Sequence, residues 1–225
     1  MRVVLFGATG MIGQGVLREC LLDDEVQAVL SIARRTTKRE HPKLLEIVHQ
    51  NLTDFSAIAS ELSGYDACLF CLGVSSVGMS EDDYRRVTHD TAIAAAKTLL
   101  ERNPGFTFVF VSGMGTDSSE SGGTMWARVK GATENSLLSM PFKASYMVRP
   151  AAVLPRHGER SRATITRIGY ALFGWLFPLI KLLFPKYVTT TERLARAMLR
   201  LAKHGGPKRI LESVDLDELG RVAST

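Results

Sequence analysis

Three glycines near the start of the chain have the spacing of a dinucleotide-binding turn. Residues 3–13 read VVLFGATGMIG, an apolar strand that runs into Gly7, Gly10 and Gly13. The first glycine lets the chain turn off the strand, the second lets the backbone approach a pyrophosphate, and the third lets the next helix pack close to the sheet. The first N–H groups of that helix then face the phosphates. We therefore expect a cofactor to lie along Gly7, Thr9, Gly10, Met11, Ile12 and Gly13.

The end of the second predicted strand bears on which dinucleotide would bind. An Asp or Glu at this point would accept hydrogen bonds from the adenosine ribose and favour NAD. This strand instead continues into Arg34 and Arg35, and no acidic residue lies between Glu25 and Glu40. Two guanidinium groups can each bind a 2′-phosphate through paired N–H donors, so the sequence favours NADP(H) over NAD. The alternative is that both arginines are surface charges in a basic turn.

Strand patterns alternate with helical patterns along the chain. We expect strands at 2–6, 26–33, 44–49, 66–72, 106–111, 144–149 and 209–212, and helices that begin near Met11, Ser56, Glu81, Thr124 and Thr189. Such alternation predicts a parallel sheet with helices on both faces. Together with the glycine turn it predicts an α/β fold with a doubly wound parallel sheet, the Rossmann fold, and a ligand at the carboxyl ends of the strands. Residues 1–225 would form a single domain, in which 155–205 are an apolar helical insertion for substrate covering or interaction.

The composition fits an ordinary α/β domain, with 225 residues of which 45% are hydrophobic. We expect a cytoplasmic protein, because no secretory leader precedes the glycine strand and three cysteines suit a reducing compartment. Cys68 and Cys71 form a CxxC pair inside an apolar run. That run predicts a buried strand, on which the two side chains point to opposite faces, so we expect no redox role. The five histidines lack metal-ligand spacing, and no metal is expected.

The C-terminal third is basic and contains a long apolar stretch. Residues 155–210 hold twelve Lys or Arg and two acidic residues, a balance of +10 in a chain of net charge +5. No nucleic-acid recognition motif accompanies them, so we expect no nucleic-acid partner. Residues 168–184 are apolar but contain Pro178 and Lys181, and the uninterrupted run is shorter than the roughly 20 residues of a membrane span. Three interpretations stay open: a lid over an apolar substrate, a homodimer interface, or peripheral contact with a membrane surface.

Taken together, these motifs resemble the short-chain dehydrogenase/reductase superfamily, related to the epimerases and dehydratases. The glycine spacing is similar to its extended and atypical branches, and residues 209–220 are similar to the Tat-interacting-protein group of atypical members. The resemblance implies that residues 51–54 cover the adenine and that the loop after the fourth strand borders the cofactor. It further implies that residues 149–151 close over the nicotinamide. The further cofactor-binding residues implied are Leu52, Leu72, Gly73, Val74, Lys130, Pro150 and Ala151.

The chain departs from the superfamily in its catalytic helix. The superfamily has Tyr-x-x-x-Lys there, and residues i and i+4 share one helix face. Here the lysine is present as Lys130, but Trp126 occupies the tyrosine position. The resemblance makes Ser112, Trp126 and Lys130 the candidate catalytic residues, with Ser112 orienting the substrate. An indole N–H donates a hydrogen bond but releases no proton at neutral pH, so Trp126 can polarise a carbonyl and cannot be the general acid. The alternatives are a turn serine, a lysine that holds only the ribose, and a tryptophan that walls an apolar pocket.

Two functions follow from this combination of motifs. The first is an NADP-dependent oxidoreductase that reduces an apolar or conjugated acceptor, such as a quinone or flavin, and needs no proton from a tyrosine. The second is a non-catalytic module that senses NADP(H) and acts on a protein or membrane partner. The retained serine and lysine favour the enzyme.

Overall fold

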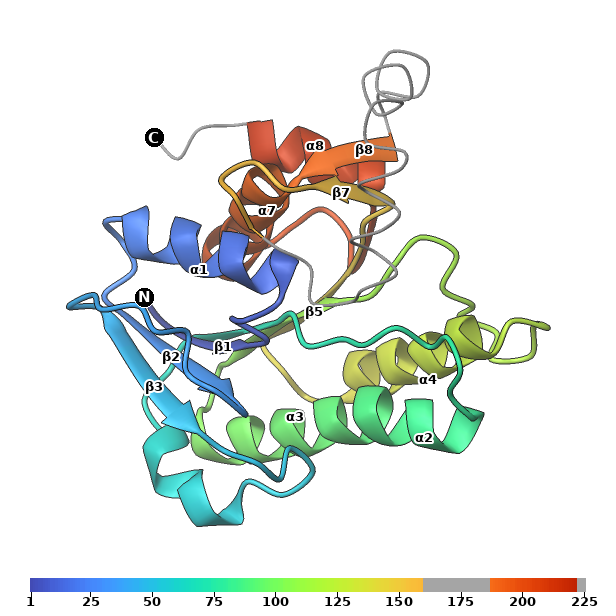
Figure 1. Ribbon diagram of the computed structural model, residues 1–225, viewed down its shortest axis with the longest axis horizontal. Coiled ribbons are helices and arrows are strands. Elements are labelled where there is room, and N and C mark those ends of the chain that lie inside the picture. The colour runs from blue at the N-terminus through green and yellow to red at the C-terminus, as the bar shows by residue number, and fades with distance from the viewer. Residues whose placement is uncertain (160–186, 222–225) are drawn as a thin grey trace.

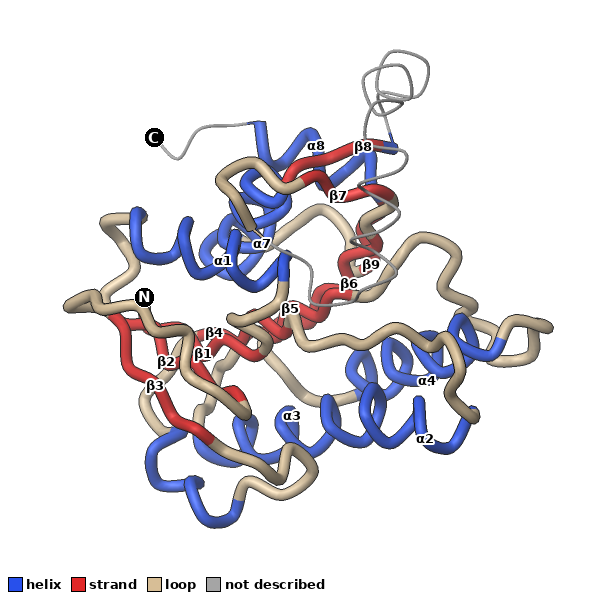
Figure 2. Tube along the Cα trace, in the orientation of Figure 1, coloured by secondary structure: helices blue, strands red, loops and turns tan. Residues whose placement is uncertain are grey.

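The computed structural model describes residues 1–159 and 187–221, and its centre is a seven-stranded parallel sheet (Figures 1 and 2). The strands are β1 (Arg2–Phe6), β2 (Ala28–Ala33), β3 (Leu44–Val48), β4 (Ala67–Phe70), β5 (Thr107–Val111), β6 (Ala144–Arg149) and β9 (Ile210–Glu212). Their order is β3-β2-β1-β4-β5-β6-β9, and every neighbouring pair is parallel. The order reverses between β1 and β4, which confirms the predicted doubly wound fold.

Helices cover both faces of the sheet. They are α1 (Met11–Leu22), α2 (Glu81–Arg85), α3 (Thr91–Arg102), α4 (Met125–Ser139), α7 (Thr191–His204) and α8 (Ser213–Arg221), with a 3₁₀-helix at Ser56–Leu62. Figure 1 shows α1, α7 and α8 on one side of the sheet and α2, α3 and α4 on the other. A Cβ atom added to Gly15 of α1 would lie 2.8 Å from Cβ of Thr191, so α1 and α7 touch at this point.

The core consists of two apolar layers, one on each face of the sheet. Alternate residues of β1 point to opposite faces. Val3 and Leu5 therefore pack with α1 and α7, and Val4 and Phe6 pack with α3. The second layer is aromatic: the Phe6 and Phe70 ring centroids are 5.1 Å apart, and those of Phe70 and Phe108 are 5.8 Å apart. Because both faces of β1 are buried, the strand reads as a continuous apolar run.

Several elements were not predicted from the sequence. Two short strands, β7 (Ala152–Leu154) and β8 (Val188–Thr190), pair in parallel outside the main sheet. A π-helical turn, Arg86–Asp90, links α2 to α3, and α8 follows directly on β9. The helix expected near Thr189 begins at Thr191, because the Thr190 side chain caps it by accepting from Arg193 N.

Cys68 lies in β4 and Cys71 follows that strand. Burial raises the pKa of both thiols, so neither has the lowered pKa of a reactive cysteine. Within residues 1–159 and 187–221, no helix is long and apolar enough to cross a membrane. The apolar run 168–184 lies outside the described residues, as do residues 160–186 of the proposed insertion 155–205.

Candidate cofactor and active site

The glycine turn between β1 and α1 is packed so tightly that side chains are excluded. Gly7 has φ +82°, and a Cβ there would lie 2.7 Å from the backbone of Cys71 and Leu72. A Cβ on Gly13 would lie 2.0 Å from the carbonyl oxygen of Gly7. Both positions therefore require glycine, for left-handed backbone at the first and for close helix packing at the second.

The start of α1 is available to an anion. Gly10 is the N-cap, and its own N–H donates to Gly7 O at 2.9 Å. No side chain caps this helix, and its first turn holds no acidic residue. The N–H groups of Met11 and Ile12 at the positive end of the helix dipole can therefore bind phosphate oxygens. Thr9 in the turn accepts a hydrogen bond from Gln14 Nε2 at its carbonyl oxygen, at 3.1 Å.

Arg34 and Arg35 follow β2 at the same edge of the sheet as the glycine turn. In the register of the two strands, Phe6 lies opposite Ile32. The carbonyl oxygen of Arg34 accepts from Gln50 Nε2 at 3.0 Å, which holds the backbone of the turn. Both arginines are exposed, and within the described part of the chain neither guanidinium pairs with a carboxylate. Both guanidinium groups are therefore available to a ligand at this edge of the sheet.

The remaining predicted border residues lie in loops at the carboxyl edge. Leu52 and Leu72 are half-buried against the aromatic layer, whereas Gly73 and Val74 are exposed. The loops after β5 and β6 are joined, since Met114 N donates to the carbonyl oxygen of Pro150 at 3.0 Å. Ala151 N donates to Ser213 Oγ at 3.3 Å.

Ser112 directly follows β5 and is buried. Its hydroxyl lies 2.8 Å from Thr116 Oγ1, and the Thr116 hydroxyl donates to the carbonyl oxygen of Gly113 at 2.8 Å. Thr116 has only one hydroxyl proton, so Ser112 is the donor in the first of these bonds. The proton of Ser112 is thus committed to Thr116, which fixes the side chain at the end of the strand.

Lys130 and Trp126 both reach the loop that follows Ser112. Lys130 Nζ donates to the carbonyl oxygen of Ser112 at 2.8 Å. A Cβ on Gly115 would lie 3.6 Å from Cη2 of Trp126, so the indole ring covers this turn. Both side chains come from the first turns of α4, one helical turn apart. The structure therefore brings the three candidate catalytic residues together around one loop.

Burial lowers the pKa of Lys130 to about 8, and the nearby carboxylate of Glu134 partly offsets this. Glu134 is fully buried one turn further along α4, where Arg149 at the end of β6 neutralises it. The sequence analysis did not single out this ion pair. In the sequence, the only sign of this pair is a glutamate at a position of the helix flanked by small and apolar residues. Its partner could not be named without the order of the strands in the sheet.

Three of the described tyrosines lie in other surroundings than the loop after β5. The Tyr146 hydroxyl accepts a hydrogen bond from Gly206 N at 3.0 Å, just past the C-terminal end of α7. The guanidinium carbon of Arg2 lies over the ring of Tyr65, 4.8 Å from the centroid of that ring. Tyr84 is buried in α2, where burial raises its pKa.

A glycine turn, an uncapped helix start and a doubly wound parallel sheet define an NAD(P)-binding Rossmann protein. The model of the NAD(P)H-binding family matches residues 7–160, and the chain belongs to this family. An oxidoreductase of the short-chain dehydrogenase/reductase family from Burkholderia thailandensis has a TM-score of 0.72 at 15% identity, over 96% of this chain and 92% of that one. The Bordetella bronchiseptica enzyme WbmF in complex with NAD⁺ has a TM-score of 0.69 at 14% identity, over 96% and 76%. These likenesses confirm the superfamily fold.

Relatives over the whole chain correct the predicted location. Protein fmp52-2, mitochondrial, of Aspergillus oryzae is 26% identical over 96% of each chain. Protein FMP52, mitochondrial, of Eremothecium gossypii is 26% identical over 100% of each chain. The expectation of a cytoplasmic protein is wrong in the light of these names. It relied on the expectation of no secretory leader and on the cysteine content, and neither feature separates the cytoplasm from other compartments.

Proposed function

We propose that the protein is an NADP(H)-dependent reductase of an apolar or conjugated acceptor that works without a catalytic tyrosine. The observation that carries this proposal is the convergence of Ser112, Trp126 and Lys130 on the loop after β5. That loop lies at the carboxyl edge of the sheet, on which the glycine turn also opens.

The chain's own groups account for the parts of the cofactor one by one. The N–H groups at the start of α1 would bind the pyrophosphate, and Arg34 and Arg35 would bind the 2′-phosphate. Lys130 would hold the nicotinamide ribose with the N–H groups that it does not use on Ser112. When bound, the nicotinamide supplies a hydride.

The supply of the proton restricts the choice of acceptor. Trp126 has no proton to give, and the hydroxyl proton of Ser112 is committed to Thr116. A quinone, a flavin or a conjugated ring can take the hydride first and its proton from water afterwards. Each turnover then converts NADPH, acceptor and one proton into NADP⁺ and reduced acceptor. Trp126 would orient the acceptor beside the nicotinamide by donating its indole N–H, and Ser112 would hold the loop through Thr116.

The experiment follows the fluorescence of NADPH bound to the purified protein while aldehydes, ketones, quinones and flavin are added in turn. We expect the signal to decay with quinone or flavin and to persist with simple ketones. A signal that persists with every acceptor would overturn the reductase and favour the alternative, a module that senses NADP(H). No bound signal at all would overturn both functions.

A further inference from the structure

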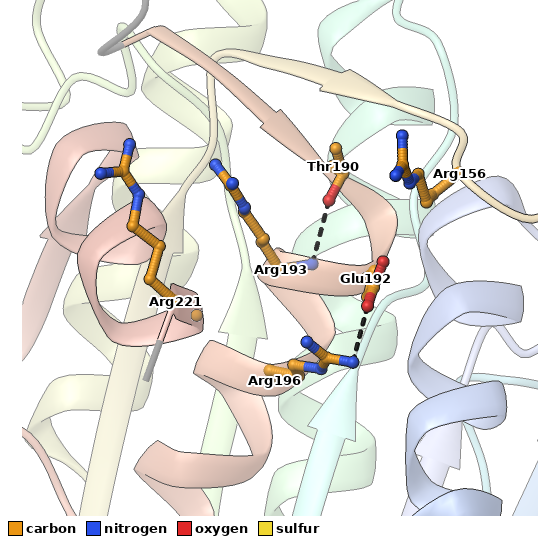
Figure 3. A pocket seen from close by; sticks show the side chains of 7 residues that line it. Arg156, Thr190, Glu192, Arg193, Arg196 and Arg221 are labelled. Carbon is orange, nitrogen blue, oxygen red and sulfur yellow. Dashed lines mark hydrogen bonds and ion pairs between the residues drawn. The ribbon is translucent and has the colours of Figure 1, made fainter. Parts of the chain in front are cut away.

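A basic cavity of about 320 Å³ lies between α7, α8 and the loop after β7 (Figure 3). Its lining residues are Arg156, Thr190, Glu192, Arg193, Arg196, Gly220 and Arg221. Four of the seven are arginines and one is acidic, so the lining side chains carry a net positive charge, which Glu19 and Asp217 behind them partly offset. None of them belongs to the glycine turn or to the group around Ser112.

Three carboxylates near the cavity, those of Glu192, Asp217 and Glu19, are paired with its arginines, and Arg196 Nε donates to Glu19 Oε2 at 2.9 Å. Glu192 accepts from Arg196 Nη2 at 2.6 Å, and its other oxygen lies 3.2 Å from His157 Nε2. Behind the wall, the buried Asp217 accepts from Arg193 at 2.7 Å and from Arg221 at 2.6 Å. Each of these last two arginines contacts Asp217 through one nitrogen in these bonds. A guanidinium has five N–H donors, so both keep donors that a ligand can use.

Arg156 is held in place by its backbone and leaves its side chain free. Its N–H donates to Glu159 Oε2 at 2.9 Å and to Thr191 Oγ1 at 3.2 Å. Its exposed guanidinium has no carboxylate partner among the residues that the structure describes. In Figure 3 this side chain stands across the cavity from Arg193 and Arg221. An unpaired guanidinium on a fixed backbone is suited to receive an anion from solution.

We propose that this cavity binds the phosphate group of a ligand other than the dinucleotide in the glycine turn. Guanidinium groups from three elements surround one space, and their N–H donors suit the oxygens of a phosphate. The start of α7 borders the same space, since its N-cap Thr190 and its first-turn residue Glu192 line the cavity, and the carboxylate of Glu192 offsets the positive end of this helix. The volume lies at the lower end of the range for small-molecule pockets, about 300–1,000 Å³, so it suits a phosphate or diphosphate and a small attached group.

The test is a titration of the full chain with inorganic pyrophosphate, read by calorimetry and thermal melting, with sodium chloride at equal ionic strength as the reference. We expect pyrophosphate to raise the melting temperature of the wild type. Arg156→Gln should weaken binding about tenfold, because one charge-assisted contact is lost. Arg200→Gln on α7 removes the same charge outside the cavity lining and should bind like the wild type. Since the side chain of Arg156 is unpaired, its replacement leaves the fold intact.

Competition with NADPH separates this cavity from the cofactor turn. If saturating NADPH abolishes pyrophosphate binding while Arg156→Gln leaves it unchanged, the anion binds at the glycine turn and the proposal is wrong. It is also wrong if pyrophosphate stabilises the wild type no more than chloride does.

The phosphate could come from a soluble molecule or from a lipid headgroup. Co-sedimentation with phosphatidylcholine vesicles containing phosphatidic acid distinguishes these sources. Sedimentation that Arg156→Gln reduces would assign the site to a headgroup. Pyrophosphate binding without sedimentation would assign it to a soluble ligand.

Discussion

Arg149 binds both carboxylate oxygens of Glu134, with Nε 3.0 Å from Oε1 and Nη2 2.5 Å from Oε2. The carboxylate is fully buried, and the pair fastens α4 to the end of β6. Lys130 lies one turn before Glu134, and Pro150 comes directly after Arg149. The positions of two candidate site residues therefore depend on this ion pair.

Replacing Glu134 by Gln should strongly destabilise the protein. The amide fits the same space but leaves the charge of Arg149 with only the partly exposed Glu212, at 3.2 Å. Loss of one partner of a buried pair costs about 3–5 kcal/mol of the free energy of unfolding. Urea unfolding measures this loss. As a control, Arg86→Gln breaks an exposed pair with Asp83 and should cost less than about 1 kcal/mol. A loss from Glu134→Gln as small as the control's would contradict the role of the pair.

Gly13→Ala should impair both folding and cofactor binding. The new Cβ would overlap the carbonyl oxygen of Gly7, so α1 must move away from the turn. Overpacking of this kind costs about 1–3 kcal/mol. We expect a lower melting temperature and at least tenfold weaker NADPH binding, measured by nucleotide fluorescence. Gly123→Ala is the matched control, since a Cβ there meets nothing within 4 Å. Equal behaviour of the two variants would rule out the close contact.

Arg34→Ala and Arg35→Ala test the choice of dinucleotide. If the two guanidinium groups bind the 2′-phosphate, each variant should bind NADPH about tenfold or more weakly, the value of a charge-assisted hydrogen bond. Binding of NADH, which lacks this phosphate, should not change. Titration calorimetry with both nucleotides provides the comparison, and Arg39→Ala in the same exposed loop is the control. Parallel loss of NADH and NADPH binding would be evidence against the assignment.

Lys130 predicts a pH dependence of stability. Its pKa is lowered by burial to about 8 in the folded protein, against 10.5 ordinarily. Between these values the unfolded chain binds more protons than the folded one, so the contribution of Lys130 to stability rises with pH. The free energy of unfolding of the wild type should therefore rise relative to Lys130→Met from about pH 8 to 10.5. Chemical denaturation at several pH values measures this, with the exposed Lys97→Met as the control for loss of a charge. A difference that falls over this range would refute the lowered pKa.

Trp126→Tyr tests whether the site is arranged for chemistry. The new phenol would stand one helical turn before Lys130, in the place from which the superfamily donates its proton. We expect a slow reduction of aldehydes or ketones that the wild type lacks, followed as NADPH oxidation. Trp126→Phe fills the same space without a hydroxyl and should show none. Equal rates for the tyrosine and phenylalanine variants would mean that the phenol gives no proton.

Much of the fold could be predicted from the sequence because its determinants are local. β1 is buried on both faces, so it is a continuous apolar run, and the glycines follow it within a few residues. The strands of the main sheet were predicted within two residues at each end. The short strands β7 and β8 were missed, and these two strands pair only with each other, outside the main sheet.

The sequence by itself determined the alternation of elements, the glycine turn and the replacement of the catalytic tyrosine by Trp126. Only the tertiary structure decided the partners: Glu134 with Arg149, Ser112 with Thr116, and the four arginines around one cavity. Elements form from contacts a few residues apart, which periodicity records. A buried charge and its partner are brought together by sheet order and helix packing, and the intervening sequence carries no trace of that.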